Sequence, residues 1–234
     1  MSVSDSTVVP PDFPVPAEFW AGLPTEAPVE PQPSGVDAFL RRTLDVSVAL
    51  SALLLLFPLL LVLALLIRLG SPGPVLFIQT RVGRHGQEFP VFKFRSMFQD
   101  AEARLGSVLS ANERSGPVFK MKQDPRVTRL GRLLRRYSLD ELPQLLNVLR
   151  GEMSLVGPRP ALPREVSLYT SLQRVRLSVT PGLTGLWQVS GRAELSFEAS
   201  VALDLEYVRQ QSFALNVVLL LKTVPAVLTG HGAY

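Results

Sequence analysis

Ser138-Leu139-Asp140-Glu141-Leu142-Pro143-Gln144 is the stretch from which the rest of the chain is most readily understood. Pro143 lacks a backbone N–H and its ring clashes with the preceding helical turn, so it belongs near a helix start. We predict a helix that begins between Ser138 and Asp140 and ends near Gly151. Either Asp140 caps this helix, or Ser138 does so in a capping box with Glu141.

The two adjacent carboxylates admit a structural and a chemical interpretation. In the structural one, Asp140 and Glu141 only close a helix end. In the chemical one they act on phosphates, because a helix N-terminus favours anions and basic residues flank the pair at Arg135, Arg136 and Arg159. A metal ion would also find carboxylate ligands here. Both interpretations stay open on this stretch alone.

Composition narrows the chemistry. The chain has 234 residues, enough for one domain, and no cysteine, which excludes disulfides, thiol nucleophiles and cysteine metal sites. The histidines are His85 and His231, far apart, so neither a histidine metal cluster nor a Ser-His-Asp triad is expected. Residues 1–34 hold five acids and no Lys or Arg, whereas the remainder carries 24 basic against 15 acidic residues. Such a basic body suits anionic lipids, phosphorylated substrates or nucleic acid.

The N-terminal region combines a polar tail with one long apolar segment. Residues 1–34 are acidic and proline-rich without apolar periodicity, which predicts a disordered tail and not a signal peptide. The apolar run Val46 to Ile67 would be about 33 Å long as a helix, enough to cross a bilayer core of about 30 Å. Pro58 lies inside this run and should kink it, and arginines flank both ends.

These features leave two membrane topologies open. A plain transmembrane helix needs an outside end, but basic residues at both flanks give no clear outside end under the positive-inside rule. A re-entrant helix enters the bilayer, bends at Pro58 and returns to the same face. Each arm is then about 14–18 Å long, which reaches roughly the middle of the bilayer. Proline also occurs in spanning helices, so the physics of the sequence does not decide between the two.

The next region predicts a hairpin and a basic helix. Residues 75–83 and 89–97 predict two strands joined by a turn at residues 83–86, and alternation in the second strand places Lys93 and Arg95 on one face. An amphipathic helix is expected from two sets of residues at helical spacing: Arg126, Arg129, Arg132 and Arg136 on one side, and Leu130, Leu133, Leu134 and Tyr137 on the other. These cations either form ordinary solvated faces or contact phosphates.

The C-terminal part offers further candidates for anion binding. Gly157-Pro158-Arg159-Pro160 holds Arg159 between two prolines, a rigidity that suits a phosphate clamp but also an ordinary turn. Residues 180–185 predict a loop whose N–H groups cradle an anion, and residues 186–189 predict a short strand that ends before Arg192. Helices are expected over 166–177 and around 201–208. The apolar run 213–221 is expected to break at Lys222 and Pro225.

Taken together, these motifs resemble those of one family. Over residues 36–234 the chain is similar to bacterial sugar transferases of the monotopic phosphoglycosyl transferase superfamily, the polyprenyl-phosphate sugar-1-phosphate transferases of exopolysaccharide assembly. The resemblance is carried, in chain order, by the proline-broken apolar helix, Ser71-Pro72-Gly73-Pro74, Gln79 and Arg81, Lys93 to Met97, Asp124-Pro125-Arg126, Ser138 to Gln144, Gly151 to Pro160, Pro181 to Gly185, Gln188 to Arg192 and Gly232-Ala233-Tyr234. Ser200 and Asn216 depart from the pattern, since many members have a basic residue and an aspartate there.

The resemblance implies how the chain is divided. The expected fold is α+β and mainly helical, with a disordered tail over residues 1–35, a re-entrant membrane helix over 36–70 and a catalytic domain over 71–234. This domain is expected to have short strands and interfacial amphipathic helices. The implied location is the cytoplasmic face of the bacterial inner membrane, with the lipid bilayer as a partner. A homodimer is left open, and no nucleic acid is expected as a partner.

The resemblance also implies a reaction. A sugar 1-phosphate moves from a UDP-sugar to undecaprenyl phosphate with release of UMP, and Mg²⁺ is the implied cofactor. An aspartate is already ionised near neutral pH, so Asp140 is expected to attack the phosphorus without a base, while Asp140 and Glu141 hold the metal. Candidate contacts to substrate and phosphate are Gln79, Arg81, Lys93, Arg95, Arg136, Arg159 and Arg192. Glucose and galactose are favoured as the sugar, and N-acetylated sugars stay open.

Two functions of other classes compete with this enzyme. A membrane-anchored scaffold that only recruits polysaccharide enzymes would share the apolar helix but would release no UMP. A basic nucleic-acid binder would share the positive charge. The long apolar run and the lack of a recognisable nucleic-acid module argue against the second.

Overall fold

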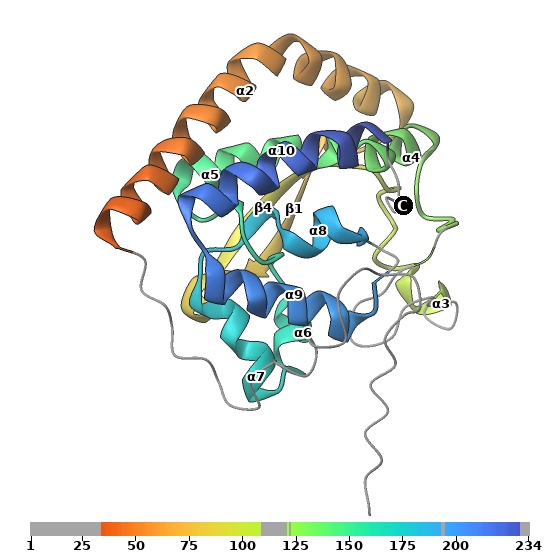
Figure 1. Cartoon of the computed structure of the whole chain (residues 1–234). Coiled ribbons are helices and arrows are strands. Elements are labelled where there is room, and N and C mark those ends of the chain that lie inside the picture. The colour runs from red at the N-terminus through yellow and green to blue at the C-terminus, as the bar shows by residue number, and fades with distance from the viewer. Residues whose placement is uncertain (1–33, 109–120, 122, 193–194, 230–234) are drawn as a thin grey trace, which may run out of the picture.

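The computed structural model describes residues 34–108, 121, 123–192 and 195–229. The expected tail and the terminal Gly232-Ala233-Tyr234 lie outside these residues. Helices predominate and surround two small sheets (Figure 1). The α+β, mainly helical class expected from the sequence is therefore confirmed.

The longest element is α2 (Gly35–Gly70), an arch over the rest of the molecule. Ser34 caps it by accepting a hydrogen bond from the Asp37 N–H at 3.2 Å. Pro58 lies within the helix, and Figure 1 shows that α2 bends strongly and brings both of its ends down to the body. Within the described residues, α2 is the helix long and apolar enough to cross a membrane.

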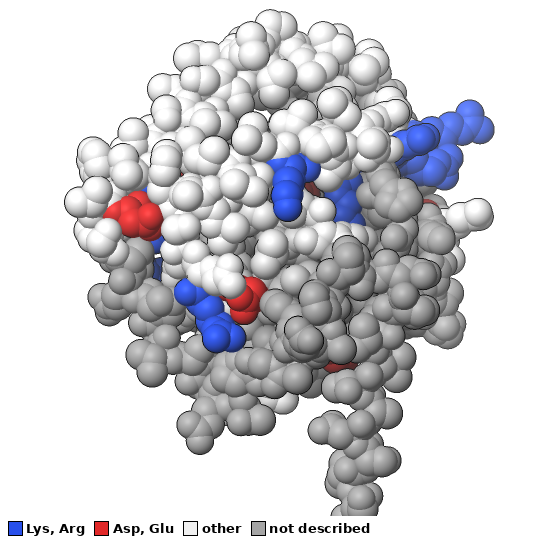
Figure 2. Space-filling model, in the orientation of Figure 1, with Lys and Arg blue, Asp and Glu red and all other residues white. Residues whose placement is uncertain are grey.

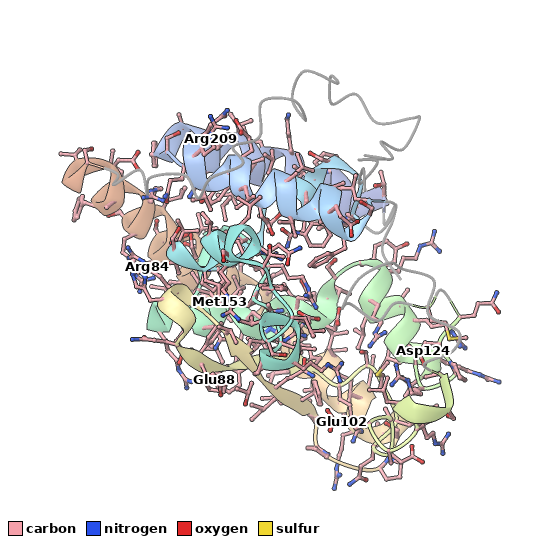
Figure 3. All side chains as sticks on the ribbon, turned by 90° about the horizontal axis from the view of Figure 1, so that it is seen from below. Arg84, Glu88, Glu102, Asp124, Met153 and Arg209 are labelled. Atoms are coloured by element: carbon pink, nitrogen blue, oxygen red, sulfur yellow. The ribbon has the colours of Figure 1, made fainter. Side chains whose placement is uncertain are left out.

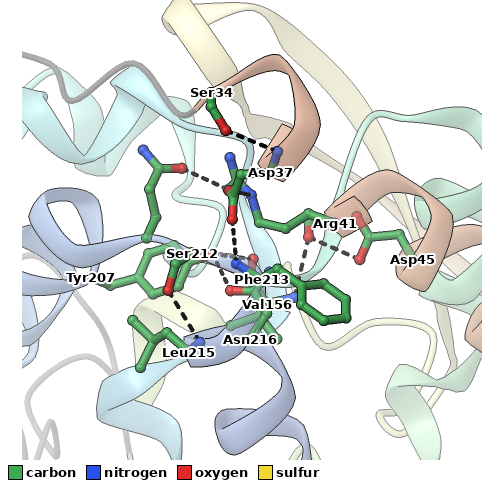
Figure 4. Close-up of polar contacts among 12 residues, drawn as sticks. Ser34, Asp37, Arg41, Asp45, Val156, Tyr207, Ser212, Phe213, Leu215 and Asn216 are labelled. Atoms are coloured by element: carbon green, nitrogen blue, oxygen red, sulfur yellow. Dashed lines mark hydrogen bonds and ion pairs between the residues drawn. The ribbon is translucent and has the colours of Figure 1, made fainter. Parts of the chain in front are cut away.

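The first arm of α2 is held to the body by polar contacts. Arg42 donates from Nη1 and Nη2 to the carbonyl oxygens of Val148 and Leu149, at 2.6 and 2.8 Å. The buried Asp45 accepts from the Leu155 N–H at 2.8 Å. Asp37 accepts from the Phe213 N–H at 2.7 Å, so the start of α2 is tied to the start of α10 (Phe213–Thr229) (Figure 4).

The second arm is held by apolar packing, and the crest between the arms is exposed. Leu63 and Ile67 are buried together with Phe94 and Leu134. The crest exposes large apolar side chains: Leu54, Leu55, Phe57, Leu59, Leu61 and Val62. Figure 2 shows uncharged residues covering this upper face, with most charged residues below it or at its edge. The arch thus presents an apolar crest above an anchored base.

Strands β1 (Leu76–Val82) and β2 (Glu88–Phe94) form the predicted antiparallel hairpin, with Phe77 opposite Lys93. The short turn η1 (Arg84–Gly86) joins them, and His85 has a φ of 56°. The edge of β2 is satisfied by the fully buried Asn147, which donates to the Pro90 carbonyl at 2.7 Å. Asn147 belongs to α5 (Leu145–Arg150), which ends at Gly151 with a φ of 80°, as predicted.

The second sheet corrects two predictions. Strand β3 (Ser154–Val156) pairs in parallel with β4 (Gly182–Thr184), so the expected loop over 180–185 contains a strand. Residues 186–189, expected as a strand, belong instead to the helix α8 (Leu186–Ser190). A short apolar run does not distinguish a buried strand from a buried helical turn by its period. The approach of the strands is close, since a Cβ on Gly182 would lie 2.0 Å from the Gly157 nitrogen.

The C-terminal helices cover this sheet and complete the core. The expected helix around 201–208 is α9 (Phe197–Gln210), and its Tyr207 donates to Asn216 Oδ1 at 2.9 Å (Figure 4). Ser200 and Asn216, the two departures from the family pattern, are both buried in this packing. The expected break at Lys222 and Pro225 is wrong, because α10 continues through both. Both residues are exposed, so the Lys222 charge is not buried, and the helix continues past Pro225 with one backbone hydrogen bond fewer.

Two further expected helices differ in the structure. The predicted helix over 166–177 is divided into α6 (Pro163–Val166), α7 (Ser171–Arg174) and η4 (Val175–Ser178). The basic helix α4 (Arg129–Arg136) starts only after its cap, Thr128, so Arg126 is outside it. Arg126 instead forms a buried ion pair with Asp124 at 2.7 Å. Leu133 is 51% exposed and not on the packed side of α4. The remaining short helix is α3 (Leu105–Val108).

Candidate active site

The carboxylate pair lies on η3 (Leu139–Gln144), a tight helix that precedes α5. Ser138 precedes it in the left-handed conformation, with a φ of 53°, and its side chain makes no capping hydrogen bond. The predicted capping box is therefore wrong, and Asp140 lies inside the helix and not at its cap. Both acids lie in the first turn of η3. Asp140 is buried, with 8% of its surface exposed.

Lys93 connects β2 to this carboxylate pair. Its Nζ lies 2.6 Å from Glu141 Oε1, and the two side chains are 26% and 34% exposed. β2 packs directly against η3, which brings residues 48 positions apart into contact. The predicted proximity of Lys93 to the acids is found, and the pair is open enough for a ligand to reach.

The pKa values of the two neighbouring acids are shifted in opposite directions. Burial raises the pKa of the Asp140 carboxyl to about 6, and the charge of Glu141 adds to this against the opposing effect of Lys93 and Arg135. Burial would also raise the pKa of Glu141, but the Lys93 ammonium, together with Arg159 and Arg81, outweighs this effect and holds that pKa below its usual value. Two carboxyls with pKa values driven apart are typical of sites where each has its own task.

Arg81 and Gln79 form one side of the site. Arg81 is buried, and it donates to the Pro160 carbonyl at 3.0 Å and to Gln79 Oε1 at 2.6 Å. Burial, followed by the charge of Arg159, lowers the pKa of Arg81 to about 9. Arg81 Nε is buried without a hydrogen-bond partner in the described part of the chain. An anion would satisfy such a donor.

Arg159 and Arg192 also act on the carboxylates. Both Arg159 and Arg81 contribute to the lowered pKa of Glu141. Arg159 Nη1 lies 3.4 Å from Oε2 of Glu165, a carboxylate that is 2% exposed. Burial lowers the pKa of Arg192, and the charge of Glu141 opposes this effect. Lys93 therefore contacts Glu141 directly, and Arg81, Arg159 and Arg192 are close enough to interact electrostatically with the same carboxylate.

Two predicted cations are not brought to the carboxylates. Arg95 donates to the carbonyl oxygens of Ser71 and Pro72, both at 2.7 Å, and so fastens the turn that follows α2. Arg136 is exposed, with its guanidinium 5.7 Å from the centre of the Tyr137 ring. The prediction that both belong with Lys93 at the site is not supported by their positions.

Arg135 is a neighbour of Asp140 that was not among the predicted site residues. Burial lowers the pKa of Arg135, and Asp140 is the strongest of the charges that oppose this shift. Its Nε donates to Ser96 Oγ at 2.9 Å, which fixes the side chain. The sequence offered a signal in the pair Arg135 and Arg136 just before the acids, but not which of the two faces them.

The carboxylates suit magnesium only in combination with a substrate. The described residues contain no group of three or more His, Cys, Asp or Glu side chains that could hold a metal. Mg²⁺ is commonly held by one or two carboxylates while waters and substrate phosphates complete its shell. Asp140 and Glu141 offer this kind of donor set. The residues present therefore fit a metal that arrives with a phosphorylated substrate.

Comparison with known proteins assigns the chain to a family. Residues 36–230 match the profile of the bacterial sugar transferases. The exopolysaccharide production protein ExoY of Sinorhizobium fredii is 42% identical over 198 residues, which cover 83% of this chain and 88% of that protein. The undecaprenyl-phosphate galactose phosphotransferase of Salmonella typhimurium is 42% identical over 200 residues, which cover 84% of this chain but 42% of that longer protein. The chain is therefore a transferase and belongs to the bacterial sugar transferase family.

Proposed function

We propose that this protein transfers a sugar 1-phosphate from a UDP-sugar to undecaprenyl phosphate and releases UMP. The proposal is supported by the names of its relatives, which include a UDP-galactose-lipid carrier transferase of Erwinia amylovora and an undecaprenyl-phosphate glucose phosphotransferase of Komagataeibacter xylinus. Glucose or galactose is the proposed sugar. A relative named for N-acetylgalactosamine, from Aeromonas hydrophila, makes that sugar the second candidate.

The observation that carries the proposal is a buried aspartate that feels the charges of Lys93 and Arg135, next to a glutamate that feels those of Lys93, Arg159 and Arg81. In the proposed first step, Asp140 Oδ attacks the phosphorus that bears the sugar. The new bond joins Asp140 to that phosphorus, and the bond to the UMP oxygen breaks, so UMP leaves with the electron pair. In the second step an oxygen of undecaprenyl phosphate attacks the same phosphorus and restores the Asp140 carboxylate. Neither step needs a proton, because both nucleophiles are anions.

The surrounding cations have distinct proposed tasks. A carboxylate that approaches a diphosphate is repelled, and fixed positive charges offset this repulsion. Lys93 orients Glu141, while Arg81, Arg159 and Arg192 contact phosphate oxygens. Asp140 and Glu141 are the residues that would hold Mg²⁺, which when bound supplies further neutralisation of the phosphate charge. Arg95 and Arg136 have no proposed role in this chemistry.

We further propose that α2 is re-entrant and holds the protein at the cytoplasmic face of the bacterial inner membrane. Support comes from its bend, its exposed apolar crest and the anchoring of both arms on one body. From Val46 to Pro58 the first arm is about 18–20 Å long, which reaches into but not across a bilayer core of about 30 Å. Tags at both chain ends should be accessible from the cytoplasm only. A tag accessible from the periplasm would establish a spanning helix instead.

The proposed reaction is tested by a screen for UMP release with a panel of UDP-sugars, undecaprenyl phosphate and Mg²⁺. We expect release with one hexose donor, and a phosphosugar adduct on the protein when the lipid acceptor is omitted. Asp140→Asn should abolish both while membrane association persists. Asp100→Asn, which changes an exposed carboxylate paired with Arg104, is the matched control. Full activity of Asp140→Asn would exclude Asp140 as the nucleophile, and no release with any donor would favour the scaffold function.

A further inference from the structure

A second polar cavity, of about 400 Å³, lies at the base of the first arm of α2. Its walls come from the first turns of α2, the hairpin turn, β3 and the segment between η4 and β4. We call it the arm pocket and define it by Arg41, Arg42, Asp45, Arg84 and Ser178. Figure 3 shows Arg84 on the hairpin turn and Met153, another wall residue, beside it.

The arm pocket is separate from the carboxylate pair. Lys93 lies opposite Phe77, whereas Arg84 follows the other end of β1, at Val82. The Lys93 level, at Phe77, and the Arg84 end, at Val82, are five residue steps apart along β1. At about 3.3 Å per residue, these steps place the arm pocket roughly 17 Å from the Lys93 level. Arg81 of the carboxylate site lies one residue before Val82, so the two sites are neighbours on the hairpin, but the reacting acids are at the Lys93 level and a ligand in the arm pocket would not be the reacting part of the substrate.

The charges in the arm pocket are not balanced. Arg41 has an acidic partner, since its Nε lies 2.8 Å from Asp37 Oδ2. Arg42 donates only to the two carbonyl oxygens of α5, and Arg84 Nε donates to the Ser178 carbonyl at 3.1 Å. Neither Arg42 nor Arg84 has a carboxylate within ion-pair distance in the part of the chain that the structure describes.

Even with its acids counted, the cavity keeps a net positive charge. Asp45 lines it, but its Oδ1 is already used by Ser154 Oγ at 3.0 Å and by the Leu155 N–H. Three guanidiniums therefore meet two carboxylates, those of Asp37 and Asp45. The carbonyl contacts fix the positions of Arg42 and Arg84 without neutralising them, and Asp45 offsets part of the Arg42 charge. The remaining positive charge is the arrangement that a bound anion completes.

The arm pocket also contains an unused hydroxyl. Ser178 Oγ is buried and has no hydrogen-bond partner in the described residues. Buried hydroxyls are normally paired, so an unpaired one at a cavity wall is a candidate ligand contact. A serine hydroxyl can donate to a phosphate oxygen, and with the two guanidiniums it forms a mixed set of charged and neutral donors.

The position of the arm pocket along α2, relative to the apolar run, indicates which anions it would meet at a membrane. Arg42 precedes Val48, an exposed residue of the apolar run, by six positions, or about 9 Å of helix. The head-group layer extends roughly 5–7 Å beyond the hydrocarbon core on each side. In the membrane placement proposed above, a tilted α2 would put Arg42 near the depth of lipid phosphates. This step rests on the membrane placement proposed above, whereas the charges and the cavity do not.

We propose that the arm pocket is a second phosphate site, distinct from the carboxylate pair, that binds the phosphate of an ester through Arg42, Arg84 and Ser178. The ester is either a phospholipid head group or a soluble phosphate ester, since the three donors recognise the same group in both. A bound phosphate would bridge α2, the hairpin turn and η4. It would thereby stabilise the seat of the first arm.

The test measures thermal unfolding of the full chain with two probes. One is glycerol 3-phosphate, titrated at constant ionic strength into protein in uncharged detergent. The other is phosphatidylglycerol mixed into phosphatidylcholine bilayers that hold the protein. The variants are Arg84→Gln and Ser178→Ala. The matched control is Arg174→Gln, because Arg174 is exposed and also donates to a carbonyl, that of Val166 at 3.0 Å.

We expect at least one probe to raise the unfolding midpoint of the wild type and the control. Arg84→Gln should require about tenfold more of that probe, as expected for one lost charge-assisted hydrogen bond. Stabilisation by the soluble probe in detergent would identify a free ester, and stabilisation by the bilayer probe alone would identify a lipid head group. The proposal is overturned if neither probe raises the unfolding midpoint of the wild type. It is also overturned if Arg174→Gln weakens the response to the probe as much as Arg84→Gln does. If Arg84→Gln does not fold, an unchanged response of Ser178→Ala overturns it. The readout is independent of UMP release, so sugar transfer and this site can fail separately.

Discussion

At Asp140, a carboxylate that the proposed reaction needs as an anion is held where burial disfavours its charge. Its pKa in the folded protein, about 6, exceeds the ordinary value of 3.8, so the folded state binds this proton more tightly than the unfolded chain. The associated stability is present below about pH 4 and is lost as the pH rises through 6. At pH 7 the ionised group destabilises the fold by on the order of 3 kcal/mol.

Asp140→Asn should therefore stabilise the protein at pH 7 by up to this amount while it abolishes turnover. The gain should disappear near pH 4, where the wild-type carboxyl is protonated. Denaturant unfolding in detergent at the two pH values measures both effects. The exposed control Asp100→Asn should change the free energy of unfolding by less than about 0.5 kcal/mol. An asparagine variant that is less stable than wild type at pH 7 would contradict this account.

The same pKa predicts the pH dependence of the first chemical step. Only the ionised Asp140 can attack, so the rate of adduct formation should rise about tenfold per pH unit up to pH 6 and then level off. Rapid-quench measurement of the UMP burst without lipid acceptor isolates this step, because the acceptor phosphate also titrates near this range. A burst rate that is constant between pH 4.5 and 7 would exclude a pKa near 6 for Asp140 in the complex that reacts.

Glu165 is expected to position Arg159. Its Oε2 accepts from the Leu162 N–H at 2.8 Å and lies 3.4 Å from Arg159 Nη1, so one buried carboxylate joins a turn to a proposed phosphate contact. Glu165→Gln keeps the neutral hydrogen bond and removes the charge. We expect KM for the UDP-sugar to rise about five- to tenfold with little change in kcat. Steady-state kinetics tests this, and an equal fall in kcat would assign Glu165 to the chemical step instead.

At the scale of elements, local sequence signals predicted the structure correctly where a single residue type determines the backbone conformation. Gly151 ends α5 with a positive φ, and the turn predicted at residues 83–86, with the alternation in residues 89–97, correctly predicted the hairpin. The pairing of β4 with β3 joins segments about 28 residues apart, and a strand of three residues leaves no local pattern. The strand was therefore predicted at residues 186–189, where α8 lies, and a loop was predicted where β4 lies. Pro225 did not end α10, just as Pro58 does not end α2, because a proline can remain inside a helix at the cost of one backbone hydrogen bond.

The same contrast between local signals and distant contacts explains which site residues could be predicted. Lys93 and the two acids could be identified from residue type, since β2 exposes alternate side chains and acids among cations suggest phosphate chemistry. Which neighbouring arginine faces Asp140 could not, because it depends on the left-handed turn at Ser138 that follows α4. Arg95 was misplaced for a related reason. The chain leaves β2 at Phe94, and the next side chain turns toward Ser71.

The bend of α2 gives a prediction at this scale. Pro58→Ala restores a backbone hydrogen bond and removes a residue that costs roughly 3 kcal/mol inside a helix. A straighter α2 cannot keep both arms on the body, so we expect part of the population to place the N-terminus in the periplasm. Accessibility of an N-terminal cysteine tag on each side of the membrane measures this. Pro225→Ala in α10 is the control, and equal accessibility in both variants would show that Pro58 does not set the topology.

For the whole molecule, the second arm of α2 joins the membrane segment to the site. Leu63 and Ile67 pack with Phe94, which directly follows Lys93, and Leu139, which directly precedes Asp140, packs against the same cluster. A change in this cluster should therefore be felt at the carboxylates, whereas a change on the crest should not. The apolar helix is then part of the catalytic fold and not only an anchor.

Leu63→Ala and Leu61→Ala separate these two roles, because Leu63 is 6% exposed inside the cluster and Leu61 is 56% exposed on the crest. Leu63→Ala should lower the free energy of unfolding by about 2–4 kcal/mol, as for other buried leucines, and reduce the rate of adduct formation. Leu61→Ala should leave both within error in detergent, since no protein contact is lost. Unfolding and UMP-burst measurements on the two variants test this, and equal effects would mean that the arm and the site are not coupled through the cluster.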